Sequence, residues 1–113
     1  MNDMNDTKAM TIRNLNDFFR RHFIGGTVVL TSGINAMPEE QRRSILRKVR
    51  DFSDFTEDND PHDERDFGAV DEGGVRCFWK IDYFNRDMTS GSPDPADDVI
   101  TTRVLTIMLA DEY

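Results

Sequence analysis

The sequence predicts an α+β fold, a single domain in which two or three helices pack on a small, mainly antiparallel sheet. Two segments in the N-terminal half show the three- and four-residue apolar spacing of helices. Residues 67–84 instead alternate apolar and polar side chains around two glycines, which is typical of a β-hairpin. A chain of 113 residues is long enough for one hydrophobic core and too short for two.

The chain begins with a polar stretch that shows no periodicity. Residues 1–10 are therefore predicted to be a disordered leader, and residues 11–113 the folded domain. A helix is predicted from Thr11 onward, and the glycine pair Gly25 and Gly26 should end it. Its apolar face is formed by Ile12, Leu15, Phe18, Phe19 and Phe23.

A strand and a second helix should follow. Residues 27–31 are rich in β-branched side chains, which predicts a buried strand. Pro38 suits the first turn of a helix, where a missing N–H costs nothing. The core side of this helix is predicted to hold Ile45, Leu46, Val49 and Phe52 or Phe55. Its opposite side is basic, with Arg42, Arg43, Arg47, Lys48 and Arg50.

The 67–84 hairpin is the predicted centre of the sheet. The loop over 53–65 before it contains Pro61 and almost no aliphatic residue, so we expect it to be exposed. The two strands should be joined by a four-residue turn over 71–74. Along the second strand one face is plainly apolar and is predicted to be core, with Val75, Cys77, Trp79, Ile81 and Tyr83.

The C-terminal part leaves two alternatives open. Residues 85–97 are predicted to be a long loop. A helical stripe then fits Ile100, Val104, Ile107 and Met108, whereas a strand from Arg103 to Leu109 is the competing prediction.

Charge distinguishes this chain from an average one. Its net charge is −8, and the acid is concentrated between Asp51 and Glu72, where ten carboxylates accompany only one basic side chain, Arg65. Such a surface repels the phosphates of nucleic acids and attracts basic proteins or cations. Direct nucleic-acid binding by the basic helix face is therefore disfavoured, and we expect that face to neutralise the adjacent acidic loop.

Several features favour a cytoplasmic protein without membrane segments. The apolar runs fall far short of the roughly 20 residues that a membrane span requires. The polar N-terminal segment lacks the pattern of an export signal. A single cysteine, Cys77, cannot form an internal disulfide, which agrees with a reducing compartment.

Four phrases of the sequence point to a family. They are "DFTEDNDP" within 51–61, "DFGAV" at 66–70, "FWKIDYFNRD" at 78–87 and "DPADDVITTRVLTIMLADEY" at 94–113. Together they resemble a family of small proteins of unknown function, found mainly in alphaproteobacteria and often among plasmid or accessory genes, over the chain from about Thr11 onward. The resemblance implies a cytoplasmic bacterial protein with no known cofactor, and it carries over no catalytic residue.

Catalytic and metal sites find little support in the residue pattern. Asp58, Asp60 and His62 do not fit a calcium-binding EF-hand loop, because the third of these three ligands is a histidine and the position that requires glycine holds Asp63. Cys77 lies on the apolar face of the hairpin and is predicted to be a core residue. His22 and His62 have no recognisable catalytic partner, and no phosphate-binding or nucleophile motif occurs. We therefore predict no enzyme, no cofactor and no metal.

The acidic segment remains as the candidate site. A carboxylate array can occupy a groove that evolved for phosphates by pairing with its basic residues. We predict a protein-interaction module that binds a basic protein surface, and as a finer hypothesis an anti-CRISPR or anti-restriction inhibitor that mimics nucleic acid. The candidate residues are Glu57, Asp58, Asp60, Asp63, Glu64 and Asp66. The first alternative is an acidic adaptor or housekeeping domain. A small enzyme or a metal-binding protein is an alternative that the residue pattern supports less. The sequence leaves the oligomeric state open.

Overall fold

The computed structural model describes residues 3–113, with side chains described from residue 7 onward. It shows an α+β fold, as predicted. The helices are α1 (Asp3–His22), α2 (Ser32–Asn35) and α3 (Glu39–Asp51), followed at the C-terminal end by a 3-10 turn, η1 (Ala110–Glu112). The strands are β1 (Thr27–Leu30), β2 (Phe67–Glu72), β3 (Val75–Asn85) and β4 (Thr101–Leu109).

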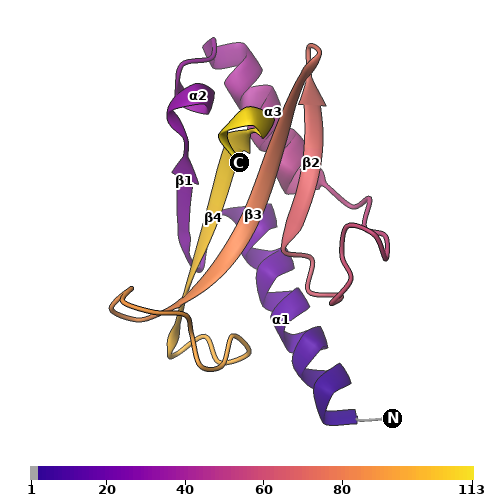
Figure 1. The fold of residues 1–113 in the computed structure, drawn as a ribbon, viewed down its shortest axis with the longest axis vertical. Helices are drawn as coiled ribbons and strands as arrows, with labels where there is room; N and C mark the ends of the chain where they lie inside the picture. The colour runs from indigo at the N-terminus through magenta and orange to yellow at the C-terminus, as the bar shows by residue number, and fades with distance from the viewer. Residues whose placement is uncertain (1–2) are drawn as a thin grey trace.

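The four strands form one mixed sheet in the order β1-β4-β3-β2 (Figure 1). The β2–β3 and β3–β4 pairs are antiparallel, and β1 lies parallel to β4. Trp79 of β3 sits at the centre of this arrangement, opposite Gly68 of β2 and Ile107 of β4. The sheet is therefore mainly antiparallel with one parallel edge.

Both long helices cover the same face of the sheet (Figure 1). The core lies between the two layers and is built around Trp79, which is fully buried. Its other buried members are Phe19, Ile34, Ile45, Val49, Val70, Cys77, Ile81, Leu105 and Ile107. The predicted core residues Ile45, Val49, Cys77, Trp79 and Ile81 are confirmed, whereas the prediction was wrong for Val75, which is 38% exposed at the tip of the hairpin.

Residues 3–10, predicted to be part of a disordered leader, lie in α1; residues 1 and 2 fall outside the described residues. Lys8, Ala9 and Met10 all have high helix propensity, and Lys8 Nζ reaches Asp94 Oδ1 at 3.7 Å. At its other end α1 stops at His22, before the predicted glycine pair, because Phe23 adopts a left-handed conformation with φ 55°.

The turn of the hairpin is tighter than predicted. The strands extend to Glu72 and Val75, so only Gly73 and Gly74 connect them. Both glycines have positive φ, 57° and 83°, which is the requirement of a two-residue turn between twisted antiparallel strands.

The C-terminal segment is a strand, and the helical alternative was wrong. β4 lies between β1 and β3, and side chains on both of its faces are buried, including the neighbours Val104 and Leu105. A strand buried on both sides shows a nearly continuous apolar run instead of alternation, which is why its sequence could be mistaken for a helical stripe.

β1 is an edge strand and not the buried strand that its composition predicted. Its residues alternate between exposed and half-buried, and Val29 is 40% exposed. Val28 and Leu30 face the core, where they lie opposite Leu105 and Ile107 of β4.

Candidate functional site

Residues 52–66, called the acidic loop below, connect α3 to β2 and hold a fixed shape through local hydrogen bonds. The backbone N–H of Thr56 donates to Asn59 Oδ1 at 2.8 Å, and the Asn59 N–H donates back to Thr56 Oγ1 at 3.3 Å. Asn59 Nδ2 also donates to the carbonyl oxygen of Asp54 at 2.9 Å. These bonds close a turn whose outer residues are Glu57 and Asp58.

Asp60 stabilises the next turn from the inside. Its side chain is buried, and Oδ1 accepts a hydrogen bond from the Arg65 N–H at 2.9 Å. Its own N–H donates to the Thr56 carbonyl at 2.8 Å. The expectation that the whole loop is exposed is therefore wrong at Asp60, whose carboxylate is turned toward the loop backbone.

Asp63 and Glu64 attach the acidic loop to the rest of the domain. Asp63 forms a salt bridge with Arg13 of α1. The Glu64 carbonyl accepts a hydrogen bond from Asn16 Nδ2 at 3.0 Å, and its carboxylate accepts one from the Tyr83 hydroxyl at 2.8 Å. Both residues therefore have partners within the molecule, although Asp63 is still 67% exposed.

Asp66, half-buried at the start of β2, has an environment that favours the protonated form. Burial raises the pKa of its carboxyl group, and the negative charge of Glu64 raises it further. The Asp66 backbone carbonyl meanwhile accepts a hydrogen bond from the Ile81 N–H at 2.8 Å, which holds the end of the loop against β3.

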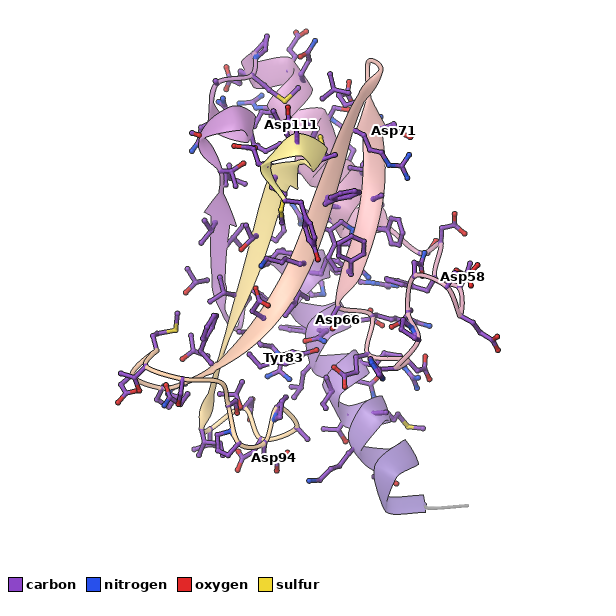
Figure 2. All side chains as sticks on the ribbon, viewed as in Figure 1. Asp58, Asp66, Asp71, Tyr83, Asp94 and Asp111 are labelled. Atoms are coloured by element: carbon purple, nitrogen blue, oxygen red, sulfur yellow. The ribbon has the colours of Figure 1, made fainter. Side chains whose placement is uncertain are left out.

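Glu57 and Asp58 are the two candidate residues that remain available. Both are exposed, and neither side chain makes a hydrogen bond or salt bridge to any residue whose side chain is described. Figure 2 shows Asp58 on the outermost part of the loop, away from the sheet. Glu57 borders an open hollow of about 570 Å³, whose other walls include Phe55, Pro61 and Arg65.

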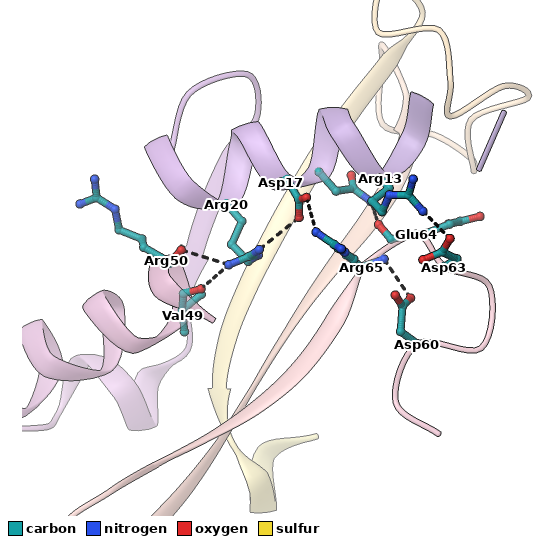
Figure 3. A network of polar contacts seen from close by, with 10 residues as sticks. Arg13, Asp17, Arg20, Val49, Arg50, Asp60, Asp63, Glu64 and Arg65 are labelled. Carbon is teal, nitrogen blue, oxygen red and sulfur yellow. Dashed lines mark hydrogen bonds and ion pairs between the residues drawn. The ribbon is translucent and has the colours of Figure 1, made fainter. Parts of the chain in front are cut away.

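A carboxylate on α1 ties the acidic loop and α3 together (Figure 3). Asp17 Oδ2 accepts from Arg65 of the loop at 2.8 Å, and its Oδ1 accepts from Arg20 at 3.2 Å. Arg20 in turn donates to the carbonyl oxygens of Val49 and Arg50, at 2.8 and 3.1 Å, at the end of α3. Its guanidinium lies over the Trp79 ring, and burial lowers its pKa.

The basic face of α3 does not neutralise the acidic loop, contrary to expectation. Lys48 pairs with Glu72 of β2 at 2.9 Å, and Arg43 pairs with Glu39 of its own helix at 2.9 Å. Instead Arg13 of α1 pairs with Asp63 of the loop, and Arg65 of the loop pairs with Asp17 of α1; neither pair was predicted.

A buried polar group lies beside this network, and sequence reasoning missed it. Asn16 accepts from Arg103 Nε at 2.8 Å and donates to the Tyr83 hydroxyl at 2.8 Å. The Arg103 guanidinium lies 5.3 Å from the centre of the Tyr83 ring. A signal was present, because Asn16 and Arg20 are spaced like the core residues Ile12 and Phe19 on the buried face of α1.

The remaining reactive side chains do not converge. Cys77 is a buried core residue, as predicted, and burial raises the pKa of its thiol, which disfavours the nucleophilic thiolate. His22 packs against the ring of Phe18, and His62 lies exposed in the acidic loop. Within the described residues no group of three His, Cys, Asp or Glu side chains could hold a metal ion.

A second hollow, on the outer side of α3, is basic. It has a volume of about 670 Å³ and is formed by the end of α1 and the exposed face of α3. We call it the arginine groove; its basic residues are Arg21, Arg43, Arg47 and Arg50, and its apolar ones are Phe23 and Leu46.

Comparisons with known proteins identify a family and no activity. Of the helices in the described part of the chain, none combines the length and hydropathy needed to cross a membrane. No curated protein and no solved structure matches the chain. A family model described as "Protein of unknown function (DUF3768)" matches residues 30–112, a range that excludes α1 and nearly all of β1. Since this match covers more than half of the sequence, the chain belongs to the DUF3768 family.

Proposed function

We propose that the protein is a non-enzymatic interaction module that presents the tip of the acidic loop to a basic surface of another protein. The observation that carries this proposal is that some acidic side chains of the loop are paired within the molecule and others are not. Asp60, Asp63 and Glu64 have partners inside the molecule, while the side chains of Glu57 and Asp58 are exposed and pair with none of residues 7–113. The first group holds the loop in place, and the second is left for a partner.

Rigidity makes these carboxylates suitable for binding. The turn around them is closed by Thr56 and Asn59, and the loop is attached to α1 through Arg13 and Asn16. Because the backbone that carries these carboxylates is already ordered, binding costs less conformational entropy than it would in a flexible loop. Their pairing with an arginine or lysine of the partner can therefore contribute most of its electrostatic energy to affinity and to the rate of encounter.

The finer proposal is mimicry of nucleic acid. A basic groove that binds phosphates also accepts ordered carboxylates, because a guanidinium pairs with both in the same forked geometry. Proteins that block CRISPR or restriction complexes often carry such acidic surfaces, and the accessory-gene setting implied by the sequence resemblance favours such a role. The site then consists of Glu57 and Asp58, with the exposed face of Asp63 beside them.

The test is affinity capture from a bacterial lysate with the wild-type protein and the variant Glu57→Lys/Asp58→Lys. We expect the wild type to retain a partner at about 50 mM salt and to lose it at about 500 mM, where the screening length falls below 5 Å. The double variant should retain none. A matched control is Glu40→Lys/Asp111→Lys, which makes the same charge change at two exposed residues outside the acidic loop.

Competition then separates mimicry from other roles. A DNA or RNA oligonucleotide should displace the captured partner if the acidic loop occupies a nucleic-acid groove. A partner that the loop variant loses but no oligonucleotide displaces would indicate an acidic adaptor and exclude mimicry. Equal capture by the wild type and Glu57→Lys/Asp58→Lys would refute the assignment to the loop.

A further inference from the structure

The arginine groove gathers positive charge that the fold itself does not use. Within residues 7–113, the guanidinium groups of Arg21 and Arg47 make no hydrogen bond or salt bridge, although both side chains line the hollow. Arg50 uses only Nε, which donates to the Arg21 carbonyl at 3.0 Å. Arg43 has an exposed partner, Glu39, in a pair of the kind that contributes little.

The grouping has an electrostatic cost in the free protein. Four guanidinium groups around one hollow repel each other, and the single carboxylate in its wall, Asp51, offsets only one of them. Such an arrangement, in a protein whose net charge is −8, is the pattern expected of a site for an anion and not of a fold-stabilising network.

The apolar side chains of the groove restrict the class of anion that fits it. Phe23 and Leu46 are half-buried apolar side chains between the arginines. One face of the Phe23 ring is already covered by the Arg50 guanidinium, 5.2 Å from its centre, so that face is not an open platform for a nucleic-acid base. An aliphatic side chain can still contact the apolar floor.

The surroundings also oppose a long polyanion. α3 ends in the groove wall at Asp51, and the acidic loop follows directly, so an extended nucleic-acid strand leaving the groove on that side would meet carboxylates. A short acidic segment confined to the groove avoids this repulsion, and its carboxylates match the forked donors of arginine.

We propose that the arginine groove, between the end of α1 and the exposed face of α3, binds an acidic peptide segment of a partner protein whose carboxylates flank an aliphatic side chain. This site is separate from the acidic loop, and its occupant carries charge of the opposite sign to that expected at the loop. Either proposal can therefore fail without the other.

The experiment measures fluorescence anisotropy of a labelled synthetic peptide in which glutamates flank a single leucine. The wild type should bind it with an affinity that falls as salt rises. The variant Arg21→Gln/Arg47→Gln should bind about tenfold or more weakly, because it removes two of the four guanidinium groups of the groove. The melting temperature of this variant should be equal to that of the wild type or higher, because two of the mutually repelling positive charges have been removed.

Three comparisons make the result specific. Arg76→Gln/Arg86→Gln removes the same charge at exposed positions elsewhere on the molecule and should leave binding unchanged. Arg21→Lys/Arg47→Lys keeps the charge without the fork and should bind with intermediate affinity. A peptide with serine in place of leucine should bind more weakly.

Other outcomes would overturn the proposal. These are peptide binding that survives in Arg21→Gln/Arg47→Gln, absence of peptide binding at low salt, or equal binding of the serine peptide. Tighter groove-dependent binding of a single-stranded oligonucleotide with the same charge as the peptide would assign the groove to nucleic acid instead.

Discussion

Asn16 shows how much a single buried polar residue contributes to this fold. Its side chain is fully buried and contacts Arg103, Tyr83 and the Glu64 carbonyl, so it joins α1 to both the sheet and the acidic loop. Its amide nitrogen donates two hydrogen bonds and its amide oxygen accepts one. An apolar side chain of the same size could make none of them. Asn16 therefore holds three parts of the chain together.

Replacing Asn16 with alanine should destabilise the protein by about 2 to 3 kcal/mol, because the buried groups of Arg103 and Tyr83 would lose a partner. Urea denaturation followed by circular dichroism measures the change. The matched control is Asn14→Ala, at an exposed position on the same helix, which should change the free energy of unfolding by less than about 0.5 kcal/mol. Equal effects of the two variants would contradict the structural role assigned to Asn16.

Asp66 should make stability fall as pH rises through the acidic range. Its folded-state pKa lies above the unfolded value because of burial and the charge of Glu64, so the folded state binds the proton more tightly. The stabilisation that the Asp66 carboxyl group contributes is fully present below its unfolded-state pKa, and it is lost as the pH rises through its folded-state pKa. Asp60 and His62 also act on this carboxyl, with opposite signs.

The variant Asp66→Asn removes this titration while keeping the size of the side chain. We expect it to melt at a higher temperature than the wild type at pH 7, with the difference shrinking toward pH 3. Thermal unfolding across that range measures both curves. A difference that grows as pH falls would show that the Asp66 carboxylate stabilises the folded state, which is the opposite of the expected sign.

At the scale of the elements, α1 is the part of the fold that positions the acidic loop. Arg13, Asn16 and Asp17 all contact the loop from one side of this helix, and Arg20 reaches from the same helix to the end of α3. Most of these interactions join segments far apart in the sequence. Sequence periodicity predicted that α1 exists, but it could not predict which loop the polar side chains on that helix would contact.

Asp17→Asn should loosen both connections made by that carboxylate. It would leave the buried Arg20 without its counter-charge and release Arg65 of the acidic loop, at a cost of about 3 kcal/mol. Hydrogen exchange should become faster at the backbone amides of the loop, including the Arg65 N–H bonded to Asp60, than in the control Asp111→Asn. Unchanged exchange in the loop would mean that Arg13 and Asn16 suffice to hold it.

The elements also show where prediction from sequence succeeds. The hairpin and α3 were predicted because their patterns are local: alternation around Gly73 and Gly74, and helical spacing of Ile45 and Val49. β4 was ambiguous because its apolar run reflects burial of both of its side-chain faces, which depends on the complete fold. The same dependence explains β1, whose exposed positions follow from its place at the edge.

At the scale of the whole molecule, the distribution of unpaired charge over the surface differs from the distribution of charge along the sequence. Glu57 of the acidic loop borders one hollow, and Arg21 and Arg47, whose guanidinium groups have no partner within residues 7–113, border another. The sequence revealed the imbalance of charge between segments. It could not reveal which charges were already paired, because pairs such as Asp63 with Arg13 and Arg65 with Asp17 connect residues that are 50 and 48 positions apart.

The contact between Lys48 and the end of β2 affects how copies of this protein behave together. β2 is an outer strand of the sheet, and such strands tend to recruit strands from other molecules. Lys48 Nζ donates to the Asp71 carbonyl and pairs with Glu72, so at this end of β2 the backbone is already engaged by a charged side chain. An incoming strand would have to displace that lysine and bring its own backbone close to an ammonium group. The helix thereby helps to protect the protein against strand-to-strand aggregation when it is concentrated.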